Sequence, residues 1–344
     1  MTTDSTARSD SALGGCDPFF ITGPALISFS GGRTSAMMLQ RIVETHGGKL
    51  PDDVYVAFAN TGKEREETLR FVHECATRWG VRVRWLEFVT DLKSVGAAGR
   101  FEEVGYNSAS RDGEPLNRLI ARKNSLFSTL RGRWCTEFCK VGVQHDFMES
   151  QGYPRGSYAE IIGFRADEYD RVVEMPQKPR AAGRDLRFPL AEAGIRKGDV
   201  NDHWTAQPFD LELERGTGNC DHCPFLNEKA RVIRARRDPL GCRWWDGHEK
   251  ARGFSFGYTS FADILAMAKA SPLLPLDDIE AEAADEIAAL RARVAELEAE
   301  NDRLTKAVGS GILGELLNDE ETDEFVNFIK FLRGQTKEAG CGKV

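Results

Sequence analysis

The sequence predicts an α/β fold, with a doubly wound parallel sheet followed by a C-terminal coiled-coil helix. Three observations support this prediction. Apolar runs of strand length alternate with helical periodicity between residues 25 and 86, a glycine pair joins the first run to the first helix, and an apolar heptad pattern follows the proline-containing link at 271–275. Strands that alternate with helices form parallel sheets that helices cover on both faces.

The N-terminal elements follow from local patterns. Residues 1–22 are rich in Ser, Thr, Gly and Asp, have no periodicity and predict a disordered tail. The run at 25–29 predicts the first strand, and Met37, Met38 and Ile42 after it have helical spacing. Further strands are predicted at 54–59 and 81–86, with a helix at 64–79 between them. We expect residues 23–262 to form one domain.

The C-terminal region has a different pattern. Between 277 and 308 the apolar residues recur at alternating steps of three and four, with β-branched residues and Asn301 at the a positions and Leu at d. This pattern favours a parallel two-stranded coiled coil and hence a homodimer. A single amphipathic helix packed on the body is the alternative. Residues 312–344 predict a final helix and a short tail.

Length and composition limit the class of protein. The 344 residues, 41% of them hydrophobic, suffice for one large domain with appendages. No apolar run approaches the roughly 20 residues of a membrane helix, and the polar start lacks a signal-peptide segment, so we expect a cytoplasmic protein with no membrane partner. Eight cysteines are too few for a disulfide scaffold of this size, which favours metal ligands in a reducing compartment.

The net charge of −8 is unevenly distributed. Residues 277–344 hold 17 acidic and 8 basic side chains, so the rest of the chain carries a net charge of +1. Basic residues gather in two clusters of the body, at 118–133 and at 229–237. Such clusters suit phosphate groups, although solvated helix faces are the simpler interpretation of either cluster alone.

The loop after the first strand has the parts of an anion site. In the phosphate loop, residues 30–35 (Ser-Gly-Gly-Arg-Thr-Ser), the glycines let the backbone approach an anion and the hydroxyls of Ser30, Thr34 and Ser35 can donate to it. The following helix N-terminus supplies unpaired amides and a positive dipole. The loop has neither the Gly-Lys-Ser/Thr of a Walker motif nor the spacing of a dinucleotide fingerprint.

This loop resembles the SGGxxS loop of PP-loop ATP pyrophosphatases, in the adenine nucleotide alpha-hydrolase superfamily, and in particular that of phage and bacterial proteins of the phosphoadenosine-phosphosulfate (PAPS) reductase-like family. The segment 58–69 also matches the stretch that follows the second strand in that group. The resemblance implies a site for ATP, PAPS or adenylylsulfate (APS), with Mg²⁺ as a further candidate. Asn60 and Thr61 could instead cap the next helix. The nucleotide-binding residues so implied are Ser28, Ser30, Gly31, Gly32, Arg33, Thr34, Ser35, Asn60, Thr61 and Glu64.

Four later stretches resemble the sulfonucleotide-reductase branch. They are 133–141, 163–171, 188–204 and 218–223. Tyr169 stands where that family has a serine. The resemblance implies that Lys140, Arg165 and Arg171 are catalytic cations aimed at phosphate or sulfate oxygens, which guanidinium groups bind in bidentate fashion.

The cysteines form two close pairs. Cys135 and Cys139 are four residues apart and would share a helix face, whereas Cys220 and Cys223 form a Cys-x-x-Cys hairpin. The arrangement resembles that of APS reductases and implies a [4Fe-4S] cluster, although the first pair is adjacent in that family. Structural zinc ranks second and unligated thiols third. Cys242 competes as the fourth ligand.

Two further cysteines and a histidine differ from the predicted metal ligands. Cys75 shares an apolar helix face and is predicted to be a core thiol. His222, between two predicted ligands, is expected beside the metal or in solvent rather than as a ligand. Cys341 resembles the nucleophile in the C-terminal tail of sulfonucleotide reductases, but the Glu and His that flank that nucleophile in the family are missing here.

Three functions remain open from the sequence. A PAPS or APS reductase would use Cys341 as nucleophile and a thioredoxin-like donor. An ATP pyrophosphatase would activate a nucleic-acid acceptor for sulfur or nitrogen transfer, and the basic clusters suit that acceptor. A non-catalytic nucleotide-binding module would bind nucleotide without turnover and recruit a partner through the coiled coil.

Overall fold

The computed structural model describes residues 17–90, 100–127, 132–178, 181–213 and 218–270. The chain divides into two units, Met1–Ser271 and Pro272–Val344. The predicted coiled coil, the final helix, Cys341 and most of the N-terminal tail lie outside the described residues, and these predictions stay untested.

The first unit contains a six-stranded sheet in the order β4-β3-β2-β1-β5-β6. All neighbouring strands pair in parallel except β3 and β4, which are antiparallel. The α/β prediction is therefore confirmed, with one reversed edge strand. The strands are β1 Ala25–Ser28, β2 Val54–Asn60, β3 Val83–Phe88, β4 Phe101–Val104, β5 Ala159–Ile162 and β6 Asp185–Arg187.

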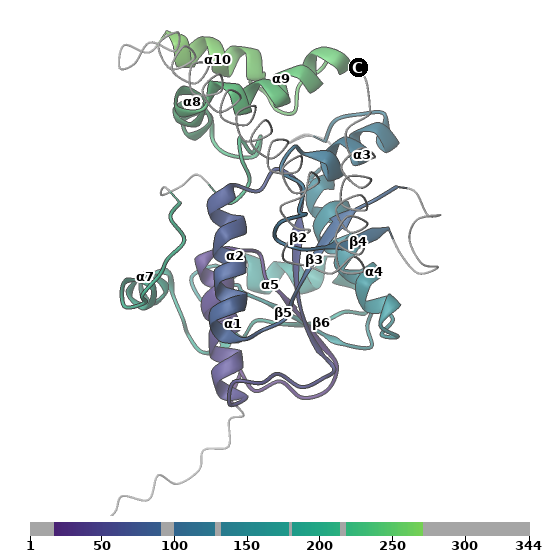
Figure 1. The fold of residues 1–344 in the computed structure, drawn as a ribbon, viewed down its shortest axis with the longest axis vertical. Helices are drawn as coiled ribbons and strands as arrows, with labels where there is room; N and C mark the ends of the chain where they lie inside the picture. The colour runs from purple at the N-terminus through teal and green to yellow at the C-terminus, as the bar shows by residue number, and fades with distance from the viewer. Residues whose placement is uncertain (1–16, 91–99, 128–131, 179–180, 214–217, 271–344) are drawn as a thin grey trace, which may run out of the picture. The chain divides into compact units, whose positions relative to one another are not determined.

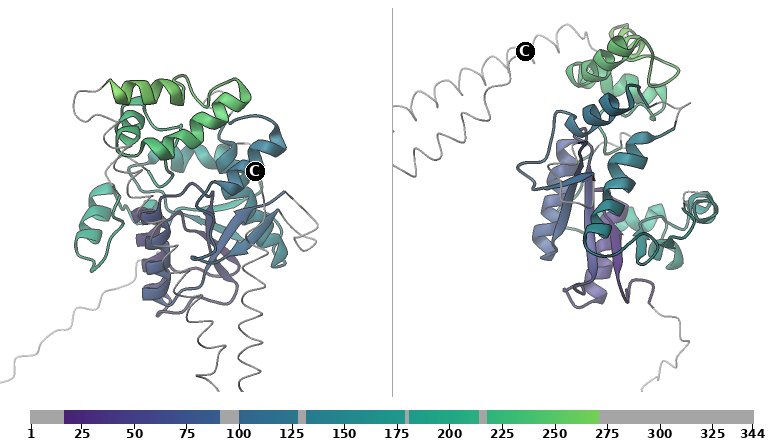
Figure 2. Two further views of the ribbon diagram at one scale, coloured as in Figure 1. Left: turned by 45° about the horizontal axis from the view of Figure 1, so that its top comes forward. Right: turned by 90° about the vertical axis from the view of Figure 1, so that its right-hand side faces the viewer.

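Helices cover both faces of this sheet (Figures 1 and 2). Helices α1 and α2 pack together on one face, and η1 and α4 pack against β2 and β3 on the other. The helices are α1 Arg33–Thr45, α2 Glu66–Trp79, α3 Glu114–Lys123, η1 Cys135–Gly142, α4 Val143–Ser150, α5 Tyr169–Gln177, α6 Pro189–Glu192, α7 Lys197–Thr205, α8 Glu228–Arg237, α9 Pro239–Arg252 and α10 Phe261–Lys269.

Burial of apolar side chains explains why the first elements form. In α1 the side chains of Met37, Met38 and Ile42 are buried, as their helical spacing predicts. Cys75 lies on the buried face of α2, with no exposed surface, which agrees with its prediction as a core thiol. The register aligns Ala25 of β1 with both Val54 and Ala159, so the loops after β1, β2 and β5 leave the sheet at the same edge.

Helices α8, α9 and α10 form a separate helical layer at the top of Figure 1. Its centre is aromatic: Trp245 packs at 5.0 Å from Phe256 and 5.6 Å from Phe261, measured between ring centroids. The buried carboxylate of Glu249 accepts hydrogen bonds from the backbone N–H groups of both phenylalanines, at 2.9 and 2.6 Å. The chain that follows Cys220 and Cys223 is thus part of a packed helical layer.

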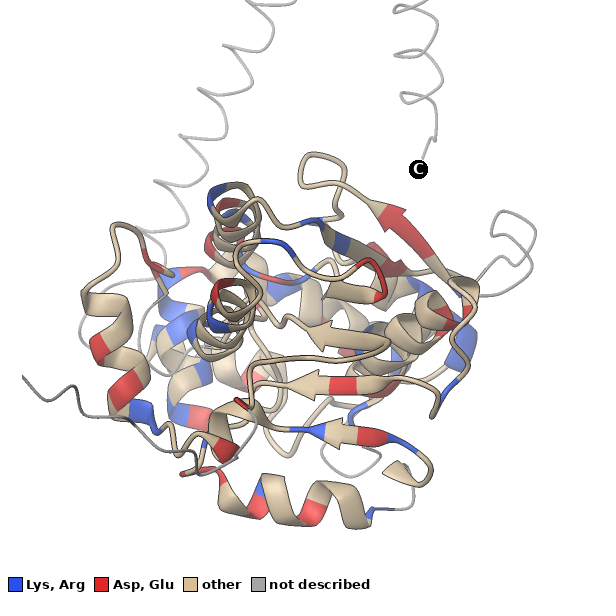
Figure 3. Ribbon diagram, turned by 90° about the horizontal axis from the view of Figure 1, so that it is seen from below, with Lys and Arg blue, Asp and Glu red and all other residues tan. Residues whose placement is uncertain are grey.

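Charged side chains of both signs are interspersed over the described ribbon (Figure 3). In the described part of the chain, no helix is both long enough and apolar enough to cross a lipid bilayer.

Candidate nucleotide and metal site

The phosphate loop forms a closed turn at the start of α1. Gly32 is the N-cap of that helix, with an extended backbone. The Ser35 hydroxyl accepts a hydrogen bond from the Ser30 backbone N–H at 3.2 Å and donates to the Gly32 carbonyl at 3.0 Å. These bonds hold the turn in place, while the amides of the first helical turn have no acceptor within the helix. The geometry suits an anion at the helix N-terminus.

Two glycines permit close packing around this loop. Gly31 has a φ of +74°, and a Cβ added there would lie 2.7 Å from Cγ2 of Thr68. A Cβ at Gly163, in the loop after β5, would lie 3.2 Å from Cα of Ser35. The loop after β5 therefore lies directly against the phosphate loop, where larger residues would not fit.

The two nearby arginines are held differently. Arg165, from the loop after β5, donates through Nη1 to the Thr34 hydroxyl at 3.3 Å and also pairs with Asp167 at 2.9 Å. Arg33 instead makes a bidentate pair with Asp210, at 2.6 and 2.5 Å. Each guanidinium is thus paired with carboxylates, Arg33 with Asp210 and Arg165 with Asp167 and Glu168, and Arg165 also bonds the hydroxyl of a loop residue.

Two other predicted residues have partners of their own. Arg171 pairs with Glu168 at 2.9 Å, and 62% of its side chain is exposed. The Ser28 hydroxyl donates to Oε1 of Gln144 in α4 at 3.1 Å. Neither of these contacts involves the phosphate loop.

The segment after β2 is buried and internally bonded. The Asn60 amide donates to Oε1 of Glu87 at 2.6 Å, and the Thr61 hydroxyl donates to Oε1 of Glu64 at 3.0 Å. Because Arg65 is the N-cap of α2, neither Asn60 nor Thr61 caps the helix, and that alternative is wrong. Asn60 and Thr61 instead stabilise the turn that leads to Glu64.

Lys140 connects this segment to η1. Its ammonium donates to Oε1 of Glu64 at 2.7 Å, and the Glu64 side chain has no exposed surface. The second carboxylate oxygen, Oε2, has no hydrogen-bond partner among the described residues. A buried carboxylate in this position requires the neighbouring positive charge.

The Cys-x-x-Cys segment runs alongside the turn after β2. The carbonyl of Asn219 accepts from the Arg65 backbone N–H at 2.8 Å, and the Asp221 N–H donates to the Lys63 carbonyl at 2.6 Å. Between them, Cys220 forms an antiparallel bridge with Glu64. The sequence therefore brings residues more than 150 positions apart into a short two-stranded contact.

Three of the predicted metal ligands line one cavity of about 170 Å³, together with Thr61 and Lys140. They are Cys135, Cys220 and Cys223. The fourth predicted ligand, Cys139, is fully buried one helical turn further, with its sulfur 4.0 Å from the Pro115 carbonyl. Cys242 is also buried but does not line this cavity.

The thiols and Lys140 influence one another. A hydrogen bond from the Cys220 thiol lowers the pKa of Cys223 to about 7, and the same bond raises the pKa of Cys220. Burial raises the pKa of Cys135 and that of Cys139. Burial opposes the charge of Lys140, but Glu64 and the thiolates outweigh it and raise the pKa of the ammonium. Of these thiols, therefore, only that of Cys223 is shifted toward the thiolate form, whereas the shifts of the other three favour the neutral thiol.

The helix with the first cysteine pair is not an α-helix. Residues 135–142 form η1, a π-helix that continues directly into α4. The four-residue spacing predicted a shared helix face; Cys135 lines the cavity, whereas Cys139 is fully buried and does not line it. Nothing in the local sequence indicated this departure.

A buried polar network surrounds His222. His222 is 2% exposed with a φ of +46°, and Nε2 lies 3.1 Å from Oδ2 of Asp238. Ligand atoms of Asp221, His222 and Asp238 lie within 4.8 Å of one another, but Arg234 already pairs with Asp221 at 2.8 Å and with Asp238 at 3.3 Å. Of the two positions expected for His222, in solvent or beside the metal, the burial excludes solvent, and the arginine supplies the positive charge that a cation would bring.

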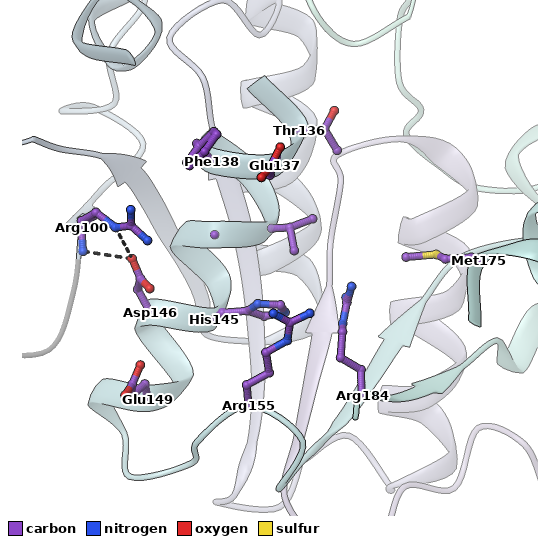
Figure 4. A pocket seen from close by; sticks show the side chains of 12 residues that line it. Arg100, Thr136, Glu137, Phe138, His145, Asp146, Glu149, Arg155, Met175 and Arg184 are labelled. Atoms are coloured by element: carbon purple, nitrogen blue, oxygen red, sulfur yellow. Dashed lines mark hydrogen bonds and ion pairs between the residues drawn. The ribbon is translucent and has the colours of Figure 1, made fainter. Parts of the chain in front are cut away.

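A second cavity, of about 550 Å³, lies beside η1 and α4 (Figure 4). Arg100 pairs with Asp146 at 3.5 Å in its wall, and His145, Arg155 and Arg184 point toward one another below. None of the residues that the sequence singled out for nucleotide, metal or catalysis lines it. No residue of the phosphate loop lines this space, and Thr136 lines both it and the cysteine cavity.

Comparisons with known proteins leave the family open. No protein-family model matches the chain. The chain is 28% identical over 201 residues to the uncharacterized nin region protein ORF290 of Escherichia phage lambda, and the match covers 58% of this chain and 64% of that protein. Among solved structures, the U34-tRNA thiolase NcsA from Methanococcus maripaludis with its [4Fe-4S] cluster aligns at 13% identity over 76% of this chain and 85% of that one. Its TM-score of 0.30 is too low to support a conclusion.

Proposed function

We propose that this chain is an adenine-nucleotide-dependent enzyme that holds nucleotide phosphates at the phosphate loop and a [4Fe-4S] cluster at its cysteines. The observation that carries the proposal is that two residues belong both to the cysteine cavity and to the network around Glu64. Lys140 and Thr61 line the cysteine cavity, and both also bond the buried Glu64 of the segment after β2. A nucleotide that extends from the phosphate loop to this segment would lie beside the thiols.

The described residues supply the contacts that a nucleotide triphosphate needs. The closed turn of Ser30 to Ser35 presents helix-terminal amides, and Arg165 adds a guanidinium at Thr34. The turn after β2 leaves the sheet at the same edge as this loop, as the register of β1 and β2 requires. Ligands of open α/β sheets bind at that edge. The resemblance of both segments to PP-loop enzymes supports ATP as the nucleotide.

The donor set fits a cluster better than a single zinc ion. Tetrahedral zinc with Zn–S bonds near 2.3 Å would require sulfurs about 3.8 Å apart. Among the described residues, Asp221, His222 and Asp238 are the only group of three metal-binding side chains with ligand atoms within 4.8 Å of one another, so no three of the thiols are that close together. Cys135, Cys220 and Cys223 would hold the cluster, and Cys139, which does not line the cavity, would have to turn toward it to serve as the fourth ligand. Bound there, the cluster would supply redox or sulfur chemistry next to the nucleotide.

With ATP, the reaction would be adenylyl transfer. An acceptor oxygen attacks the α-phosphorus, the bond to the bridging oxygen breaks, and pyrophosphate leaves with the electron pair. Arg165 and the loop amides would stabilise the charge that develops on pyrophosphate. The reductase alternative, in which a thiolate attacks the sulfonucleotide sulfur, requires Cys341, a residue outside the described part of the chain.

Metal analysis tests the cluster. Protein purified under argon would contain iron and sulfide and absorb broadly near 400 nm, as [4Fe-4S] proteins do. Cys220→Ser would lose both, whereas Cys242→Ser, which alters a thiol outside the cavity, would retain them. A colourless protein with one zinc per chain, or with no metal, would exclude the cluster.

Product analysis tests the nucleotide chemistry. The proposal expects pyrophosphate release from ATP in the presence of nucleic acid and no sulfite from PAPS or APS with reduced thioredoxin. Sulfite formation would assign the reductase reaction instead. Tight binding of ATP without release of any product would indicate a binding module.

A further inference from the structure

Asn219 lies between the two parts of the proposed site. Its side-chain Nδ2 donates to the Ser30 carbonyl of the phosphate loop at 2.8 Å. The next residue along the chain is Cys220, which lines the cysteine cavity. The residue that contacts the phosphate loop and a proposed metal ligand are therefore adjacent in the sequence.

The hydrogen bond to Ser30 orients a phosphate-binding amide. In a trans peptide the C=O and N–H groups point in opposite directions, so a donor that fixes the Ser30 carbonyl also fixes the direction of the Gly31 N–H. Asn219 also packs closely here, because a Cβ on Gly32 would lie 3.3 Å from Nδ2. The Asn219 amide thus holds the backbone of the loop in one orientation.

Asn219 cannot move independently of the cysteines. Its own carbonyl accepts from the Arg65 N–H at 2.8 Å, and the bridge between Cys220 and Glu64 continues the pairing. A metal bound by Cys220 and Cys223 would restrict this segment at its other end. Restricting it in advance lowers the conformational entropy that nucleotide binding must remove.

We propose that Asn219 couples metal occupancy of the cysteine cavity to nucleotide affinity at the phosphate loop. The coupling rests on the proposed function, because it presupposes both ligands. Asn219 is a positioning residue in this scheme: it acts on the Ser30–Gly31 peptide and needs no contact with nucleotide. By linkage, nucleotide must tighten metal binding by the same free energy by which metal tightens nucleotide binding.

The test is a double comparison of ATP affinity by calorimetry. Full-length protein reconstituted with iron and sulfide is compared with the same protein stripped by chelator and reductant, for wild type, Asn219→Ala, Asn219→Ser and Asn201→Ala. Asn201 is a matched control, since it lies in α7, lines the same cavity as Gly32 and Asn219, and makes no side-chain bond to Ser30 among the described contacts. We expect the metal-loaded wild type to bind ATP about tenfold more tightly than the stripped form, in the usual range for coupled sites.

In both Asn219 variants the ratio of the ATP affinities of loaded and stripped protein should fall to near one, chiefly because the loaded form binds ATP more weakly. The Asn201 control should keep the wild-type ratio. Unchanged iron content and melting temperature in the Asn219 variants would show that the loss is local. The coupling would be overturned if loaded and stripped wild type bound ATP equally well, or if the Asn219 variants kept the wild-type ratio of the two affinities. Either result would leave the proposed function intact. Failure of wild type to bind ATP or metal would instead reject the proposed function.

Discussion

The ammonium of Lys140 lies 2.7 Å from Oε1 of Glu64, a carboxylate with no exposed surface, and it also lines the cavity of Cys135, Cys220 and Cys223. One lysine of η1 therefore neutralises the buried Glu64 carboxylate and lines the same cavity as the three thiols. Its removal should affect stability and ligand binding together.

Replacing Lys140 with Met should destabilise the fold. The change leaves the buried Glu64 carboxylate without its cation, which costs 3–5 kcal/mol for a fully buried pair; because 34% of the Lys140 side chain is exposed, we expect about 2 kcal/mol. Urea denaturation measures the difference. Lys178→Met is the control, because both partners of its pair with Glu174 are exposed, and it should change stability by less than about 0.5 kcal/mol. Equal effects of the two substitutions would contradict the role of Lys140.

Gly31→Ala should disrupt the phosphate loop. The new Cβ would lie 2.7 Å from Thr68 in a backbone with a φ of +74°, so steric overlap adds to conformational strain. We expect a loss of about 2–4 kcal/mol in unfolding free energy, together with weaker nucleotide binding. Gly47→Ala has a similar φ of +66° with nothing within 4 Å and should cost only about 1 kcal/mol. If both variants lost the same stability, overlap with Thr68 would not be the cause.

Arg165→Ala should weaken ATP binding more than Arg33→Ala. Both guanidinium groups pair with carboxylates, but Arg165 also donates to the Thr34 hydroxyl of the loop, whereas the bonds of Arg33 go to Asp210 and the Leu211 carbonyl. A hydrogen bond to a charged group contributes about 1.5–3 kcal/mol, which corresponds to at least a tenfold loss for Arg165. Arg33→Ala should change affinity by no more than a few-fold, as titration calorimetry can determine. The reverse order would mean that Arg33 leaves Asp210 when nucleotide binds.

The Glu160 carboxylate should contribute to stability only above acidic pH. Burial opposes its charge, but hydrogen bonds from His145 and Arg184 outweigh burial and lower its pKa from 4.5 to about 2. A carboxylate with a lowered pKa stabilises the fold above its unfolded pKa and loses that contribution as pH falls through its folded pKa. Wild type should therefore exceed Glu160→Gln by about 3 kcal/mol at pH 7, and the gap should shrink between about pH 4.5 and pH 2. Denaturation curves at several pH values measure the gap, and a constant difference would reject this explanation.

Much of the fold could be predicted from sequence because its signals are local. The apolar runs at 25–29 and 54–59 correspond to β1 and β2, and the helical spacing of Met37, Met38 and Ile42 corresponds to α1. The third strand begins at Val83 rather than at 81, since periodicity locates strand ends poorly. The reversed direction of β4 had no local signal at all.

The parts of the site that could not be predicted depend on tertiary contacts. Which of Arg33 and Arg165 faces the phosphate loop depends on Asp210, which lies 177 residues after Arg33. The burial of His222 accompanies its contact with Asp238, which lies 16 residues later in the sequence. No pattern in one segment carries such information, because each of these pairs joins different elements.

The π-helix also affects how this chain can change length. Each residue of an ordinary α-helix turns the chain by about 100° about the axis, and each residue of a π-helix turns it by less, because its hydrogen bonds span five residues rather than four. Deleting one residue within 135–142 would let η1 adopt regular α-helical bonding, and the larger turn of each remaining residue would offset much of the turn that the deleted residue made. The direction of Cys135 relative to α4 would therefore change by much less than it would after a deletion in a regular α-helix.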